Sequence, residues 1–165
     1  MQIEIRKATI ADADDIGSVH YQAWIETYTG LINADFLANR SPSKSSERFR
    51  QNRCQNIAVA TVDGKIVGFC GYGAPRDSDI SNDWGELYGI YVLRQYQHIS
   101  LGKRLISRAK SELHAQRYKR MFLWVLNSNQ NAIAFYEKNG FLFDGKEKTE
   151  RYITPIVEKR YICTL

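Results

Sequence analysis

Apolar and polar residues alternate along several short stretches of this chain, and this two-residue period predicts β-strands. Two of the stretches flank the pair Asp63-Gly64, which is a strong hairpin signal between apolar runs. A later stretch is rich in aromatic and branched side chains, which pack well on a sheet. The strands expected in the first part of the chain are residues 3–8, 56–62, 65–73 and 84–92.

Elsewhere apolar residues recur at steps of three and four, which predicts amphipathic helices. Thr9 and Asp12 have the spacing of a capping box and open the first helix. Its apolar side consists of Ala13, Ile16, His20, Ala23, Trp24 and Thr27. Residues 30–52 predict one or two short helices that are broken near Pro42. A longer helix is expected over residues 101–117 because leucine and alanine recur there every four residues.

The rest of the chain completes the pattern. Further strands are expected at residues 121–126, 141–147 and 158–165, and a helix at about residues 130–138. The order is therefore β-α-α-β-β-β-α-β-α-β-β. No internal repeat, low-complexity segment or linker interrupts it. We expect a single domain over residues 1–165, of the α/β (α+β) class, in which one mixed sheet carries helices on both faces.

The composition narrows the class of protein. A chain of 165 residues with 44% hydrophobic residues can bury one core, and it has no apolar run long enough to cross a membrane. The first ten residues alternate charge and hydrophobe, unlike a secretory signal. Cys54, Cys70 and Cys163 are widely separated and lack zinc-ligand spacing, so we expect structural thiols and no metal site. These features predict a cytoplasmic protein that does not enter a membrane.

The charge favours an anionic partner. The net charge is +5, and much of the excess lies within residues 103–120. A phosphorylated small molecule and nucleic acid both fit this charge, and an ordinary solvated helix face is the alternative. A small nucleic-acid-binding domain would rest on charge alone, so specific nucleic-acid binding is not expected.

A phosphate site is indicated where the fourth strand passes through a polar turn into the long helix, at residues 91–105. A helix start offers free backbone N–H groups and a partial positive charge. The glycine patterns of P-loop and dinucleotide-binding proteins are absent, which argues against nucleotide hydrolases and nicotinamide enzymes.

The turn and a later segment together resemble the GNAT superfamily of N-acetyltransferases. The acetyl-CoA loop of that family reads [QR]-x-x-G-x-[GA], and residues 97–102 here read QHISLG. The second signature, N-x-x-A-x-x-[FL]-Y-x-x-x-G-F, is matched by Asn129, Ala132, Phe135, Tyr136, Gly140 and Phe141. The resemblance covers nearly the whole chain. It implies a mostly antiparallel sheet splayed at the fourth strand, with acetyl-CoA as the cofactor.

The resemblance also assigns the cofactor-binding residues. The diphosphate would lie on the turn formed by Gln97, His98, Ile99, Ser100, Leu101, Gly102 and Lys103, and the pantetheine amides would pair with the strand edge at Ile90, Tyr91 and Val92. Ser100 replaces a family glycine, and we expect its hydroxyl to cap a free N–H or to donate to a phosphate. Gly102 lies where the diphosphate should come closest. His98 faces either the diphosphate or solvent, and Asn129 either binds pantetheine or caps its helix.

Chemistry at the acetyl group needs a base and an acid. Strand alternation places Glu86 on one face with Tyr88 and Ile90, which makes Glu86 the candidate base; a salt-bridged glutamate is the alternative. The loop acids Asp77, Asp79 and Asp83 are weaker candidates. Tyr136 matches the family tyrosine near the cofactor sulfur and would be the acid, or else a core aromatic.

Substrate contacts are expected from the first helix, where Trp24, Tyr28 and His20 could line a pocket or belong to the core. Glu86 would also face the substrate. We therefore expect acetyl transfer from acetyl-CoA to a primary amine of a small molecule or peptide by direct attack. The alternative is a non-catalytic acyl-CoA-binding sensor of the same fold. Oligomeric state is left open, a homodimer included.

Overall fold

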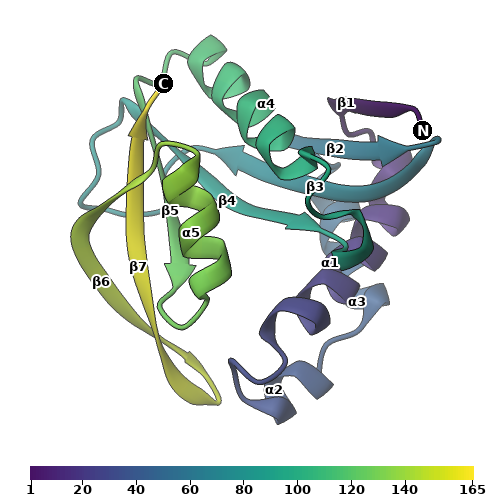
Figure 1. Ribbon diagram of the computed structural model, residues 1–165, viewed down its shortest axis with the longest axis horizontal. Helices are drawn as coiled ribbons and strands as arrows, with labels where there is room; N and C mark the ends of the chain where they lie inside the picture. Colours follow the sequence, from purple (N-terminus) through teal and green to yellow (C-terminus); the bar gives the residue numbers. More distant parts are fainter.

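A computed structural model describes all 165 residues, and its strands join one seven-stranded sheet in the order β1-β2-β3-β4-β5-β7-β6 (Figure 1). The strands are β1 (Ile3–Lys7), β2 (Ile57–Val62), β3 (Lys65–Gly73), β4 (Trp84–Val92), β5 (Arg120–Leu126), β6 (Leu142–Tyr152) and β7 (Thr154–Thr164). The helices are α1 (Ala13–Tyr28), α2 (Ala34–Ala38), α3 (Pro42–Gln51), α4 (Leu101–Ala115) and α5 (Gln130–Lys138), with 3-10 turns η1 (Ile10–Asp12) and η2 (Arg94–Tyr96). The predicted fold class and strand order are confirmed. Residues 30–52 form two helices, α2 and α3, so the chain has one helix more than the predicted order.

Helices cover both faces of the sheet. Alternation along β2 sends Ala58 and Ala60 into the core beneath α4 and α5, and Ile57 and Val59 into the core beneath α1 and α3. Figure 1 shows α4 and α5 in front of the sheet and the start of α1 behind it. No helix of the protein combines the length and the apolar character needed to span a membrane.

Short sequence motifs correctly predicted where several helices and strands begin or end. The capping box is present: the backbone N–H of Thr9 donates to Asp12 Oδ2 at 2.7 Å, and the 3-10 turn leads into α1. The β2–β3 turn uses Asp63 and Gly64 with φ of 49° and 80°, the left-handed pair that a tight hairpin requires. Pro42 is the first residue of α3, where a missing N–H has no cost.

The sheet opens between β4 and β5. Every other strand pairing is antiparallel, but β4 and β5 run parallel and pair only at Trp84, Gly85 and Glu86. Beyond Glu86 the edge of β4 facing β5 has no strand partner, through to Val92. The splay expected at the fourth strand is therefore confirmed, and it exposes backbone N–H and C=O groups inside the protein.

A β-bulge in β4 makes one prediction wrong. Gly71 pairs with Gly89 but Tyr72 pairs with Leu87, so β4 has one extra residue at this point. The alternation slips there, and Ile90 packs against the same core as Leu87, beneath α4. Glu86, Tyr88 and Ile90 therefore do not share a face, because strict period two holds only in an unbulged strand.

The last two strands are longer than expected. The sequence predicts strands at residues 141–147 and 158–165, but β6 and β7 continue until they meet at Ile153, with φ of 67°. Charged residues dominate the added part of β6, which is an exposed edge strand and so lacks an apolar period. The extension brings Tyr152 against α2, where its ring stacks on Phe36 with centroids 4.5 Å apart.

Candidate active site

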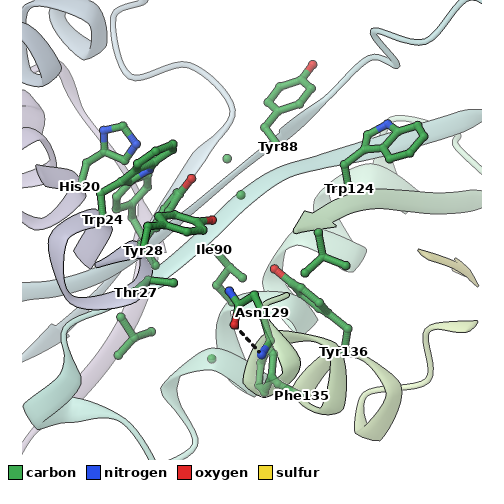
Figure 2. A pocket seen from close by; sticks show the side chains of 18 of the residues that line it. His20, Trp24, Thr27, Tyr28, Tyr88, Ile90, Trp124, Asn129, Phe135 and Tyr136 are labelled. Carbon is green, nitrogen blue, oxygen red and sulfur yellow. Dashed lines mark hydrogen bonds between the residues drawn. The ribbon is translucent and has the colours of Figure 1, made fainter. Parts of the chain in front are cut away.

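A large cleft lies where β4 and β5 diverge. Figure 2 shows α1 side chains on one side, α5 side chains on the other, and Ile90 between them. The predicted site residues that line the cleft are Trp24, Tyr28, Glu86, Ile90, Tyr91, Val92, Gln97, His98, Ser100, Leu101, Gly102, Lys103, Asn129 and Tyr136. Ile99 does not line it, because its side chain packs against the core beneath α4.

The turn before α4 leaves a run of backbone N–H groups free. No N–H group from His98 to Lys103 donates to a backbone carbonyl, and the first such bond at this helix start joins Arg104 N to Ser100 O at 3.1 Å. His98 and Ser100 are left-handed, with φ of 66° and 67°. Left-handed residues next to helical ones direct successive N–H groups to one side, which forms an anion-binding concavity. The turn therefore has the geometry of a phosphate site at the positive end of a helix.

Ser100 does not cap α4 through its side chain. The expectation that its hydroxyl satisfies a free N–H is wrong, because side-chain capping uses an extended backbone and Ser100 has φ of 67° and ψ of 9°. Glycine adopts this conformation without steric cost, so serine here keeps a glycine-like backbone shape. A contact between its hydroxyl and a phosphate stays a prediction.

Gly102 has a role in packing that the sequence did not indicate. Its backbone is helical, and a Cβ atom there would lie 2.8 Å from Cζ of Phe135. The absence of a side chain therefore leaves room for the Phe135 ring of α5 against the start of α4. Gly102 also lines the cleft, so close approach of a phosphate stays a prediction beside this structural role.

Asn129 begins α5. Its Oδ1 accepts a hydrogen bond from the Ala132 N–H at 3.2 Å, so the capping alternative is confirmed (Figure 2). The residue is buried and lines the cleft. Since the oxygen is engaged, the amide NH₂ is the group left for a ligand.

Tyr136 belongs both to the core and to the cleft. Its ring packs beside Phe135 and Phe141, with centroids 5.5 Å and 5.7 Å away. Figure 2 shows the Tyr136 side chain extending from α5 toward the α1 side chains, with its hydroxyl group at the end that faces them. Burial raises the pKa of this hydroxyl above its usual value of 10, so it carries a proton at neutral pH.

Glu86 is a buried, ion-paired carboxylate. Its side chain is 1% exposed, and Oε1 accepts from Nη2 of Arg76 at 2.6 Å while Oε2 accepts from the Arg76 backbone N–H at 2.9 Å. The guanidinium of Arg76 also lies over the Tyr88 ring, 4.6 Å from its centre. The salt-bridged alternative is confirmed, and a catalytic role for Glu86 stays a prediction.

The weaker acidic candidates anchor the loop between β3 and β4. Asp77 accepts from Nε1 of Trp124 at 3.1 Å. Nη1 of the buried Arg160 lies 3.4 Å from Asp77 and 3.2 Å from Asp79. Asp83 does not line the cleft. These contacts hold the loop against β5 and β7 and leave neither Asp77 nor Asp79 without a partner.

The predicted aromatic residues of α1 lie at the cleft (Figure 2). Trp24 and Tyr28 are half-buried, with ring centroids 4.5 Å apart. His20 is 8% exposed, and its Nδ1 lies 3.1 Å from Ser45 Oγ. Burial lowers the pKa of His20 to about 3, so the ring is neutral. His20 is therefore chiefly a core residue, whereas Trp24 and Tyr28 form the wall.

Three further residues join this wall without having been indicated by the sequence patterns: Arg40, Tyr152 and Glu158. The Arg40 guanidinium lies over the Trp24 ring, 3.8 Å from its centre. Glu158 is 3.5 Å from Lys148, and burial raises its pKa above the ordinary glutamate value. We call Trp24, Tyr28, Arg40, Tyr152 and Glu158 the α1 end of the cleft. The α4 end consists of residues 97–103 with Asn129 and Tyr136.

One of the missed residues had a signal in the sequence. Along β7 the two-residue period places Glu158 between Ile156 and Arg160, both of which are buried. A carboxylate on an inward-facing position is uncommon unless it is paired or functional. Arg40 and Tyr152 had no such signal, because their positions depend on how α2 meets the β6–β7 hairpin.

The remaining chemistry-bearing groups are not arranged as a site. No group of three or more His, Cys, Asp or Glu side chains could hold a metal ion. All three cysteines are buried and free, and burial raises the pKa of Cys70 to about 12.

Comparison with known proteins agrees with this geometry. Residues 21–141 match the model of the acetyltransferase (GNAT) family. The uncharacterised N-acetyltransferase YuaI of Bacillus subtilis is 29% identical over 136 residues, which cover 82% of this chain and 78% of the relative. A spermidine N(1)-acetyltransferase of Thermoplasma acidophilum is 26% identical over 98% of this chain and 99% of its own.

Solved structures share the fold. The PaiA N-acetyltransferase of Thermoplasma acidophilum, crystallised in complex with coenzyme A, superposes with a TM-score of 0.78 at 23% identity. The match covers 96% of this chain and 98% of that one.

Proposed function

Since the chain belongs to the acetyltransferase (GNAT) family and is an acetyl-CoA-dependent N-acetyltransferase, we propose that it transfers the acetyl group by direct attack of a primary amine. The acceptor is a small molecule or a peptide. The observation that carries the proposal is the cleft itself, in which a phosphate-binding turn and an aromatic, charged wall meet where β4 and β5 diverge. No cysteine lines the cleft, which supports transfer without an acyl-enzyme.

The residues present fit acetyl-CoA, which supplies the activated thioester carbonyl. The free N–H groups of His98 to Lys103 would hold the diphosphate. The unpaired edge of β4 at Ile90, Tyr91 and Val92 would hydrogen-bond the pantetheine amides, as an added strand would. The NH₂ group of Asn129 is placed to donate to a pantetheine carbonyl.

Removal of a proton from the acceptor is the first requirement. An amine with a pKa of about 10.4 is mostly protonated at neutral pH, so forming the nucleophile costs about 4 kcal/mol without a base or desolvation. Glu86 is the base that the sequence predicts, but both of its oxygens already accept hydrogen bonds from Arg76. Glu158 offers the alternative, because it lines the cleft and its raised pKa brings it nearer to neutral pH. We therefore propose that Glu158 removes the proton from the amine and that Glu86 holds Arg76 in position.

Protonation of the leaving sulfur is the second requirement. The Tyr136 hydroxyl points into the cleft and keeps its proton at neutral pH. It would donate that proton, or a hydrogen bond, to the sulfur atom as the thiolate leaves. The position of the hydroxyl at the cleft supports this assignment over a purely structural role.

The acceptor is less defined than the reaction. The Thermoplasma acidophilum relative is named for a polyamine, spermidine. From that relative we infer for this chain only that the acceptor is an amine. A cytoplasmic location and a homodimer stay predictions.

The test is thiol release from acetyl-CoA in the presence of a panel of amines, with acetyl-CoA affinity measured by calorimetry. We expect thiol release only when amine is added. Binding of acetyl-CoA with no thiol release on any amine would contradict the proposed reaction. A burst of thiol equal to the enzyme concentration before amine is added would contradict direct attack.

A further inference from the structure

Two buried side-chain polar atoms of the protein lack a hydrogen-bond partner, and both lie at the α1 end of the cleft. They are Nε1 of Trp24 and Nε of Arg40. Both are N–H donors, and they belong to one stacked pair, since the guanidinium of Arg40 lies 3.8 Å from the centre of the Trp24 ring. Buried donors are almost always satisfied in folded proteins. The Tyr91 hydroxyl lies beside Trp24 Nε1, so it is the Arg40 donor that indicates an acceptor that the chain does not supply.

Arg40 also differs from the other arginines of the cleft wall. Arg76 is paired with Glu86, and Arg94 donates to the backbone carbonyl of Glu26. Arg48 has no ion pair either, but it is exposed to solvent, whereas Arg40 is not. Arg40 is half-buried, yet it forms no ion pair and donates no hydrogen bond within the chain. Its terminal guanidinium nitrogens are therefore available to a ligand in the cleft that it lines.

The backbone around Arg40 is fixed on both sides. Asn39 ends α2 with its N–H bonded to Asp35 O at 3.1 Å, and Ser41 caps α3 by accepting from the Lys44 N–H. The Trp24 ring, over which the Arg40 guanidinium lies, limits the orientations that the guanidinium can adopt. Stacking leaves the N–H edge of an arginine free, and that edge matches the two oxygens of a carboxylate.

We propose that the acetyl acceptor carries a carboxylate as well as its amine, and that Arg40, stacked on Trp24, binds this carboxylate. The proposal rests on the proposed function and specifies its substrate class, the amino acids. Glu158 lies at the same end of the cleft and matches the amino group, so the two charged residues would orient a zwitterion.

Two other ligands fit Arg40 less well. The phosphates of the cofactor have their own donors in the turn at residues 98–103. A polyamine has no anionic group, and it would place positive charge beside an unpaired guanidinium.

The experiment compares amino acids with amines that lack only the carboxylate. Phenylalanine is measured beside phenethylamine and lysine beside cadaverine, within a panel of amino acids that also includes spermidine. The two readouts are thiol release from acetyl-CoA and calorimetric binding of each ligand to protein saturated with coenzyme A. The variants are Arg40→Gln, Arg40→Lys and, as a matched control, Arg53→Gln, which removes an exposed charge after α3 and outside the cleft.

For at least one pair we expect the amino acid to exceed its matched amine by about tenfold or more in kcat/KM, the scale of a hydrogen bond to a charged group. Arg40→Gln should remove most of this preference through KM, Arg40→Lys should restore part of it, and Arg53→Gln should leave it intact. Acetyl-CoA affinity should not change in any variant.

Equal or better use of the amines without carboxylate would overturn the proposal, as would the absence of carboxylate-dependent binding at millimolar concentration. A loss of acetyl-CoA affinity in Arg40→Gln would assign Arg40 to a cofactor phosphate instead. If no amine releases thiol but amino acids bind and Arg40→Gln abolishes that binding, the carboxylate site stands and the proposed function fails.

Discussion

The α4 end and the α1 end of the cleft are made from different parts of the polypeptide. At the α4 end most of the groups facing the cleft are backbone N–H donors of one continuous turn, joined by the side chains of Asn129 and Tyr136, and the arrangement of the turn follows from the left-handed residues His98 and Ser100. At the α1 end they are side chains from α1, the α2–α3 connection and the β6–β7 hairpin. A backbone site tolerates side-chain substitution as long as the φ angles survive. A side-chain site changes its ligand with a single substitution.

The largest expected effect is at the α4 end, in Gly102→Val. Valine would bring branched carbons against a phosphate and against the Phe135 ring, which lies 2.8 Å from the Cβ position. We expect acetyl-CoA affinity to fall more than about a hundredfold, because the ligand can no longer approach the backbone. Calorimetry measures the affinity and thermal unfolding measures the fold.

Packing and binding can be separated with a second change. Gly102→Val combined with Phe135→Ala relieves the contact between α4 and α5, and it should regain part of the melting temperature without regaining affinity. A double variant that binds acetyl-CoA normally would show that Gly102 serves packing alone.

Tyr136→Phe tests a residue that projects from the α4 end toward the α1 end. We expect roughly 10²-fold or more loss in kcat, with melting temperature and acetyl-CoA affinity retained, since only the donor is removed. Tyr161→Phe is the control, because Tyr161 is buried in the same core but does not line the cleft. A variant that loses stability while keeping kcat would assign Tyr136 to the core.

Glu158→Gln and Glu86→Gln compare the two carboxylates. Burial raises the pKa of Glu158, so its base form grows as pH rises above the ordinary glutamate range. We expect Glu158→Gln to lower kcat/KM by about 10- to 100-fold at neutral pH, and by less at high pH, where the amine loses its proton unaided.

Glu86→Gln should instead lower kcat/KM by a factor that is constant with pH. In our assignment the substitution breaks the ion pair that holds Arg76 and does not remove the catalytic base. The pH profile of kcat/KM measures both variants. If the pH-dependent loss belongs to Glu86→Gln, the original prediction of Glu86 as the base is correct and our assignment to Glu158 is wrong.

The smallest expected effect is that of Ser100→Gly. Glycine adopts φ of 67° without strain. One hydrogen bond from the serine hydroxyl would contribute about 0.5–1.5 kcal/mol to binding, so the affinity for acetyl-CoA should change by at most about tenfold. The melting temperature should not fall. Ser107→Gly, within α4, is the control and should destabilise by about 0.5 kcal/mol. A hundredfold loss of affinity in Ser100→Gly would show that the serine hydroxyl is a principal phosphate ligand.

The same contrast explains what the sequence could predict. The elements up to α5 and the α4 end could be predicted because their signals are local: the capping box at Thr9, the Asp63-Gly64 turn, and the motif at residues 97–102 with its partner at Asn129. The role of Gly102 could not, since it depends on Phe135 in another helix.

Long-range contacts account for the remaining differences. The bulge at Tyr88 moves Ile90 to the other face, and it is visible only when β3 and β4 are paired. Arg40 meets Trp24 because two short helices return the chain across α1. Such a contact leaves no period and no motif in the sequence, so the α1 end of the cleft could only be predicted in part.

The short pairing of β4 with β5 also determines how the two halves of the sheet are joined. Strands β1–β4 form one antiparallel block and β5–β7 another, and three residue pairs connect them. The core spans both blocks, with Leu87 of one packed among the same cluster as Met121 and Leu123 of the other. Hydrophobic contact is non-directional, so within the sheet only the three residue pairs of β4 and β5 oppose a relative shift of the two blocks through hydrogen bonds. The cleft thus lies at the boundary between the two blocks, and a ligand that contacts both β4 and α5 would hold the blocks together. The melting temperature of the whole protein should therefore rise with the concentration of its own substrates.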